Sequence, residues 1–117
     1  MSGLRILVCG GRDYSDSRAV YRALDRIRAE RGIAVLIHGA ARGADSIAAR
    51  WAEQENVATL AFPADWEQHG RAAGPKRNQQ MLDEGRPDGV VAFPGGVGTA
   101  DMVRRAQAAG IGVWRPA

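Results

Sequence analysis

The stretch Gly89-Val90-Val91-Ala92-Phe93-Pro94-Gly95-Gly96-Val97-Gly98-Thr99 decides the fold. Its first five residues form an apolar run that predicts a buried strand, and the apolar residues that follow fall at helical spacing: Met102, Val103 and Ala106. A glycine-rich turn between a strand and a helix brings backbone N–H groups to the helix N-terminus, where the helix dipole also favours negative charge. We therefore expect a phosphate or nucleotide to bind at this turn, on Pro94, Gly95, Gly96, Gly98 and Thr99.

Outward from this stretch, the chain alternates strands with helices. The apolar patterns predict strands at 4–9, 33–37, 57–62, 88–93 and 111–114, and helices at 17–31, 44–56, 75–86 and 99–109. Asp16 or Ser17 suits the N-cap of the first helix, and Gly32 suits its end. This alternation predicts an α/β fold. We expect residues 1–117 to form a single doubly wound Rossmann-like domain, with a five-stranded parallel sheet in the order 3-2-1-4-5 and helices on both faces.

Composition limits the class of protein. A chain of 117 residues with 45% hydrophobic and 25% charged residues is ordinary for a soluble globular domain. The single cysteine, Cys9, cannot form an internal disulfide and is expected as a buried core thiol, which fits a reducing cytoplasm. Residues 10–13 interrupt the first apolar run early, and no window approaches the ~20 apolar residues of a membrane span. We expect a cytoplasmic protein that does not enter membranes.

The formal net charge is +3, and only one of the 16 basic residues, Lys76, is a lysine. Arginine binds phosphate well because its planar fork can contact two oxygens at once, although genome composition could equally produce this preference. Three arginines line one face of the first predicted helix: Arg18, Arg22 and Arg26. A solvated surface stripe is the default interpretation of this face, and nucleic-acid contact is the alternative.

The unusual loops all follow strands, at 10–13, 38–45, 63–74 and 94–99. Because ligands of doubly wound folds bind at the carboxyl ends of the strands, these loops are expected to converge on one rim. Gly10 and Gly11 can bring backbone close to a ligand with Arg12 as an anion clamp; a glycine turn with an exposed arginine is the alternative.

The second loop offers Gly39, Arg42, Gly43 and Asp45. Asp45 stands at a predicted helix start, where it can cap the helix, contact a ligand, or both. In the long polar loop at 63–74, a loop length usually functional or mobile, Trp66 can stack on a base or sugar or anchor the loop to the core.

Pro75 suits the first position of the third helix. Arg77 and Asn78 follow it, and Arg77 can offer its guanidinium to a phosphate or remain a surface arginine. His38 and His69 are the only histidines, and no cysteine or carboxylate stands at metal-ligand spacing to them, so we expect no metal and no cofactor. A serine triad is also unsupported, because the Gly-x-Ser-x-Gly elbow is absent from the sequence.

Together these motifs resemble the SLOG superfamily, the Rossmann-like domains shared by DprA/Smf and the LOG "lysine decarboxylase-like" proteins, and within it the YspA branch, related to YpsA. The resemblance covers almost the whole chain. It rests on 10–13, 38–39, 42–45, 63–66, 74–78 with Met81, and 94–99 with Asp101.

The resemblance implies a nucleotide or nucleotide-derived ligand held by the glycine loops, and pairing of two copies through helices as a homodimer. LOG enzymes cleave the N-glycosidic bond of nucleoside monophosphates with a glutamate and an arginine. Arg77 and Met81 match the arginine motif, but the glutamate position falls on Met102, which cannot ionise. Asp101 is adjacent, yet one helical step rotates it by about 100°.

Three functions follow, and binding or sensing of a nucleotide is favoured because the glutamate is missing. The first alternative is a LOG-like phosphoribohydrolase with Arg77 and Asp101 as catalytic residues, in which a carboxylate would stabilise the developing positive charge on the ribose. The second is DprA-like binding of single-stranded nucleic acid, ranked last because few aromatic residues are available to stack on bases.

Overall fold

A computed structural model describes residues 3–116 and contains a five-stranded, fully parallel sheet. The strands are β1 (Leu4–Cys9), β2 (Ile33–His38), β3 (Ala58–Ala61), β4 (Gly89–Ala92) and β5 (Gly112–Trp114). Their order across the sheet is β3-β2-β1-β4-β5. The predicted fold class and strand order are therefore confirmed, and each strand lies within one residue of its predicted bounds at either end.

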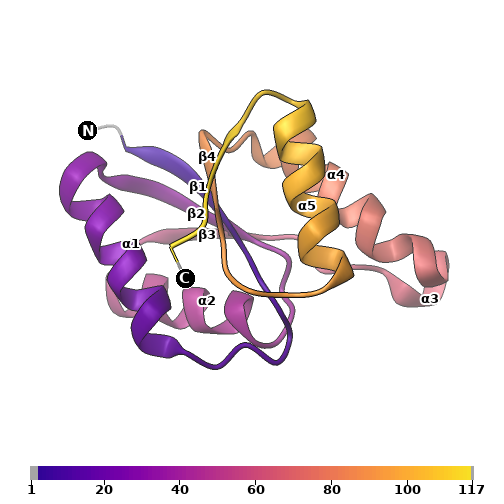
Figure 1. Ribbon diagram of the computed structural model, residues 1–117, viewed down its shortest axis with the longest axis horizontal. Helices are drawn as coiled ribbons and strands as arrows, with labels where there is room; N and C mark the ends of the chain where they lie inside the picture. Colours follow the sequence, from indigo (N-terminus) through magenta and orange to yellow (C-terminus); the bar gives the residue numbers. More distant parts are fainter. Residues whose placement is uncertain (1–2, 117) are drawn as a thin grey trace.

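Helices cover both faces of the sheet. Figure 1 shows α1 (Ser17–Arg31) and α2 (Ala44–Gln54) on one side, and α4 (Ala73–Gly85) and α5 (Val97–Ala108) on the other. Each pair closes its own core, because successive strand residues point to opposite faces. Leu24 and Trp51 pack with Val8 on the first face, whereas Met81 and Met102 pack with Leu7 on the second.

The first helix begins and ends as its sequence suggests. The Asp16 carboxylate accepts a hydrogen bond from the N–H of Ala19 at 3.0 Å, which caps the N-terminus. Gly32 ends the helix with a φ of 77°, a left-handed conformation that favours glycine.

The segment expected as a long polar loop, at 63–74, is instead largely helical. It contains a short α3 (Trp66–His69) and a 3-10 turn, η1 (Gly70–Ala72), which leads directly into α4. Asp65 caps α3 by accepting from the N–H of Gln68 at 3.0 Å. Helix α4 also begins at Ala73, so Pro75 is its third residue and not its first. Proline is tolerated there because the first-turn N–H groups have no partner within the helix.

The central strands place the site. β1 lies between β2 and β4, and Cys9 is paired with Ala92 across β1 and β4. The direction of strand progression reverses between these two strands, and the loops that follow them leave the same edge of the sheet. This edge is where a doubly wound sheet forms its ligand crevice.

Cys9 is buried, as expected, and burial raises the pKa of its thiol to about 12, with the nearby Asp45 carboxylate adding to the effect. Within residues 3–116, none of the helices combines the length and apolar character needed to cross a bilayer.

Candidate functional site

A cavity of about 550 Å³ opens at the carboxyl ends of the strands. All four predicted loops contribute to its wall: the β1 loop through Gly10–Arg12, the β2 loop through Ala41 and Asp45, the segment after β3 through Trp66 and Arg71, and the β4 loop through 96–99. Helix α4 adds Arg77 and Asn78. The structure thus brings together residues that are far apart in the sequence.

The N-terminus of α5 forms one wall of the cavity. The helix begins at Val97, two residues earlier than predicted, and Gly96 precedes it with no capping side chain. The first three N–H groups of a helix have no partner within it. A Cβ placed on Gly96 or Gly98 would meet no heavy atom within 4 Å, so the backbone here is open to an approaching group. This wall suits an anion, because the free N–H groups and the helix dipole act together.

Other glycines of the site face protein rather than open space. Gly11 donates its N–H to the carbonyl of Pro94 at 2.9 Å. A Cβ on Gly95 would lie 2.7 Å from the Gly11 nitrogen and overlap the Thr99 hydroxyl. Gly43 has a φ of 79°, and its Cβ would lie 2.6 Å from the Arg12 carbonyl oxygen. These glycines let three loops pack against one another.

Part of the predicted set therefore lies outside the main cavity. Pro94, Gly95 and Arg115 line a smaller cavity of about 250 Å³. Gly96 and Thr99 line this cavity as well as the main one. Gly39 and Arg42 line a different cavity, described below. Gly43 lines neither of these nor the main cavity within the described chain.

Asp45 orders the second loop. Its side chain is buried, and Oδ2 accepts from the N–H groups of Gly39 at 3.1 Å and Ala41 at 3.2 Å. Gly43 occupies the N-cap of α2 and the Asp45 carboxylate makes no capping bond, so the cap considered above does not form. Burial raises the pKa of Asp45 to about 6, although these hydrogen bonds and the charges of Arg77 and Arg12 oppose the rise. Oδ1 makes no hydrogen bond with the described residues, and Asp45 lines the main cavity.

Arg77 connects α4 to the second loop. Its guanidinium donates to the carbonyl oxygen of Gly39, and its Nε donates to Asn78 Oδ1 at 3.1 Å. A Cβ on Gly39 would overlap this guanidinium, which explains why a glycine occupies this position. Burial lowers the pKa of Arg77, and Asp45 works against this effect. The positive charge of Arg77 is thus fixed in place beside the cavity.

Asp101 is held by three donors. Asn78 Nδ2 and Arg105 Nε donate to its Oδ2 at 2.9 and 2.8 Å, and Arg104 Nη2 donates to Oδ1 at 2.9 Å. Burial acts to raise the pKa of Asp101, but these hydrogen bonds and the two arginine charges outweigh it and hold the pKa below its usual value. Met102, at the position where the LOG resemblance places a glutamate, is 1% exposed and packs in the core.

Trp66 does not anchor its segment in the core. It is 48% exposed, and the Arg12 guanidinium carbon lies 5.1 Å from its ring centroid. This distance is typical of a cation–π pair. Both side chains line the main cavity, so the Arg12–Trp66 pair borders the space that a ligand would fill.

The main cavity is also lined by two arginines that the sequence analysis did not single out, Arg71 and Arg104. Arg71 falls in the segment expected as a loop, where no periodicity indicated which way it points. Arg104 stands three residues after Asp101, a spacing that places both on one helix face. With Arg12 and Arg77, the cavity has four arginines, against Asp45 and the already paired Asp101.

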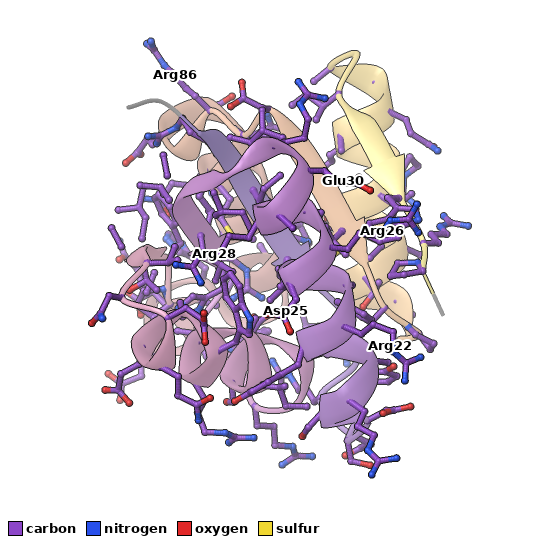
Figure 2. All side chains as sticks on the ribbon, turned by 90° about the vertical axis from the view of Figure 1, so that its left-hand side faces the viewer. Arg22, Asp25, Arg26, Arg28, Glu30 and Arg86 are labelled. Carbon is purple, nitrogen blue, oxygen red and sulfur yellow. The ribbon has the colours of Figure 1, made fainter. Side chains whose placement is uncertain are left out.

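The arginine stripe of α1 is separate from this cavity. Arg18, Arg22 and Arg26 are exposed and none of them lines it. Figure 2 shows Arg22 and Arg26 along α1 with the acidic Asp25 and Glu30 on the same helix. Arg26 pairs with Glu30 at 3.3 Å and lies 6.0 Å from the Trp114 ring centroid. The stripe is therefore mixed in charge. Among residues 3–116, no three His, Cys, Asp or Glu side chains gather as a metal site would need.

Comparison with known proteins adds sequence relationships to this geometry. A sequence profile of the YspA, cpYpsA-related SLOG family (YAcAr) matches residues 4–69, which include the first two loops and end just after Trp66. The Gene 61 protein of Mycobacterium phage D29 is 44% identical over 117 residues, covering 93% of this chain and 93% of the phage protein. The search of solved structures found no match for this chain.

Proposed function

This chain belongs to the YspA, cpYpsA-related SLOG family, and on that premise we propose that its main cavity binds a nucleotide or nucleotide-derived ligand. One observation carries the proposal: the uncapped N-terminus of α5 opens into a cavity that four arginines also line. Free N–H groups, a helix dipole and guanidinium groups all favour phosphate. The volume of about 550 Å³ lies within the range of small-molecule sites.

Each part of the ligand has a matching wall. The phosphate lies at 97–99, where Gly98 leaves room for it. The base stacks on the exposed Trp66 ring. Asp45 Oδ1 accepts a hydrogen bond from a ribose hydroxyl, because Oδ2 is already used by the loop.

Binding without turnover is favoured over hydrolysis by the surroundings of Asp101. A carboxylate that promotes departure of a base must face the ribose, whereas both Asp101 oxygens already accept from Asn78, Arg104 and Arg105. The neighbouring Met102 cannot take over this role. Incubation with AMP should release no free adenine above the buffer rate, measured by chromatography. Release that Asp101→Asn abolishes would overturn this part of the proposal and assign a phosphoribohydrolase.

The binding proposal is tested by calorimetry and thermal shift with nucleoside monophosphates, ADP-ribose, NAD and cyclic nucleotides. At least one should bind and stabilise the fold. Gly98→Glu should weaken that binding at least tenfold, since it adds negative charge beside the phosphate. Gly98→Gln is the matched control of equal size without charge, and it should weaken binding less. No binding at millimolar concentration, or equal effects of the two variants, would contradict the assignment of this wall to phosphate.

A further inference from the structure

A second cavity of about 380 Å³ adjoins the main one. Four residues line both cavities: Arg12, Ala41, Trp66 and Arg77. The remaining lining of the second cavity comes from the loop at 39–42 and from Pro63 and Ala64. Because the two cavities share these lining residues, they lie side by side, and a molecule long enough to pass the Arg12–Trp66 pair could occupy both.

The second cavity is positively charged. Its lining contains Arg12, Arg42 and Arg77, and no aspartate or glutamate among the described residues. Arg42 donates to Asp13 at 3.3 Å, but the two side chains are 74% and 95% exposed, so the pair adds little stability. A ligand phosphate can therefore take the guanidinium from Asp13 at small cost.

Along 39–41, side chains and not backbone would hold an anion. The N–H groups of Gly39 and Ala41 are used by Asp45, and that of Ala40 donates to His38 Nδ1 at 3.0 Å. This differs from the α5 N-terminus, where the N–H groups are free. The two cavities thus present two distinct anion-binding surfaces, with the Arg12–Trp66 pair between them.

We propose that the ligand carries two phosphate groups separated by a nucleoside, one at the α5 N-terminus and one in the second cavity on Arg42. This inference rests on the proposed function and specifies its ligand class. The middle of the ligand would pass the Trp66 ring, which lines both cavities. A linear, 5′-phosphorylated dinucleotide has this arrangement of phosphates.

The test is calorimetry with AMP, GMP, CMP and UMP and with the matching 5′-phosphorylated dinucleotides. For at least one of the four bases, the protein should bind the dinucleotide at least tenfold more tightly than the mononucleotide. Arg42→Ala should remove most of that advantage and leave mononucleotide affinity within twofold. Arg71→Ala is the matched control: Arg71 lines only the main cavity, so its loss should weaken both ligands by the same factor. Both variants remove exposed arginines, and unchanged melting temperatures would verify their folding.

The outcomes separate this inference from the function on which it rests. Mononucleotide binding with no dinucleotide advantage, or an Arg42→Ala variant that weakens both ligands equally, would overturn the two-phosphate ligand and leave nucleotide binding intact. No binding of either ligand would overturn the two-phosphate ligand, and nucleotide binding would fall with it only if ADP-ribose, NAD and cyclic nucleotides also failed to bind.

Discussion

Replacement of Gly43 by alanine should destabilise the fold, because this glycine allows the first two loops to touch. Gly43 has φ 79° and ψ −129°, a region that costs other residues about 1–3 kcal/mol. Its new Cβ would also displace the Gly11 carbonyl, which accepts from the N–H groups of Tyr14 and Ala44, both at 3.2 Å. Each lost hydrogen bond costs about 0.5–1.5 kcal/mol. The combined loss is about 2–6 kcal/mol, and at ~4 °C per kcal/mol the melting temperature should fall by roughly 8–24 °C.

The assay is urea unfolding followed by circular dichroism, with Gly98→Ala as the matched control. Gly98 lies in the first turn of α5, and a Cβ there meets nothing within 4 Å. Its replacement should leave stability unchanged or raise it by up to about 1 kcal/mol. A loss below about 1 kcal/mol for Gly43→Ala, or equal losses for both variants, would refute the division of the site glycines into loop-packing and cavity-facing groups.

Three more predictions follow from buried polar groups. The pKa of Asp45 rises from 3.8 to about 6 in the folded state, so its contribution to stability should fall by about 2 kcal/mol as pH rises from 4 to 6.5. Asp45→Asn should flatten that part of the pH-stability curve, and parallel curves would exclude Asp45 as the source. Asp101→Asn should cost about 1–3 kcal/mol in urea unfolding, since it weakens the charge-assisted bonds that Asp101 accepts from Asn78 on α4 and from Arg105 on α5. Arg104→Ala, whose side chain is 70% exposed, is its near-neutral control, and similar losses would contradict the network. Cys9, with a pKa raised to about 12 by burial, should resist Ellman's reagent at pH 8 until the protein unfolds; rapid labelling of the native protein would show that the thiol is accessible.

The fold was predictable because it depends on patterns that neighbouring residues carry. Apolar runs such as 89–93 and helical spacing such as that of Val20 and Leu24 need no distant partner to be recognised. The segment at 63–74 was mispredicted for the same reason. Its helical turns bury little, so no apolar period marked them, and the cap by Asp65 was the only local signal.

The location of the site was predictable from the sequence, but the role of each residue within it was not. A glycine in a loop looks the same whether its missing Cβ makes room for a ligand or for another loop. Gly98 and Gly95 are three residues apart, yet one faces open space and the other packs against Gly11. Similarly, Asp45 could cap a helix or order a loop, and only the positions of Gly39 and Ala41 decided between them.

The sequence by itself determined the strand–helix alternation, the parallel sheet and the edge at which the loops gather, because these follow from local periodicity and the handedness of the connections. Tertiary structure alone decided which side chains meet there. The Asp101 carboxylate accepts a hydrogen bond from Asn78, which lies on a different helix and 23 residues away in the sequence. Arg12 came to lie over Trp66, and Arg77 against Gly39, through packing across the sheet edge. Such contacts depend on distances between separate elements, which no local pattern encodes.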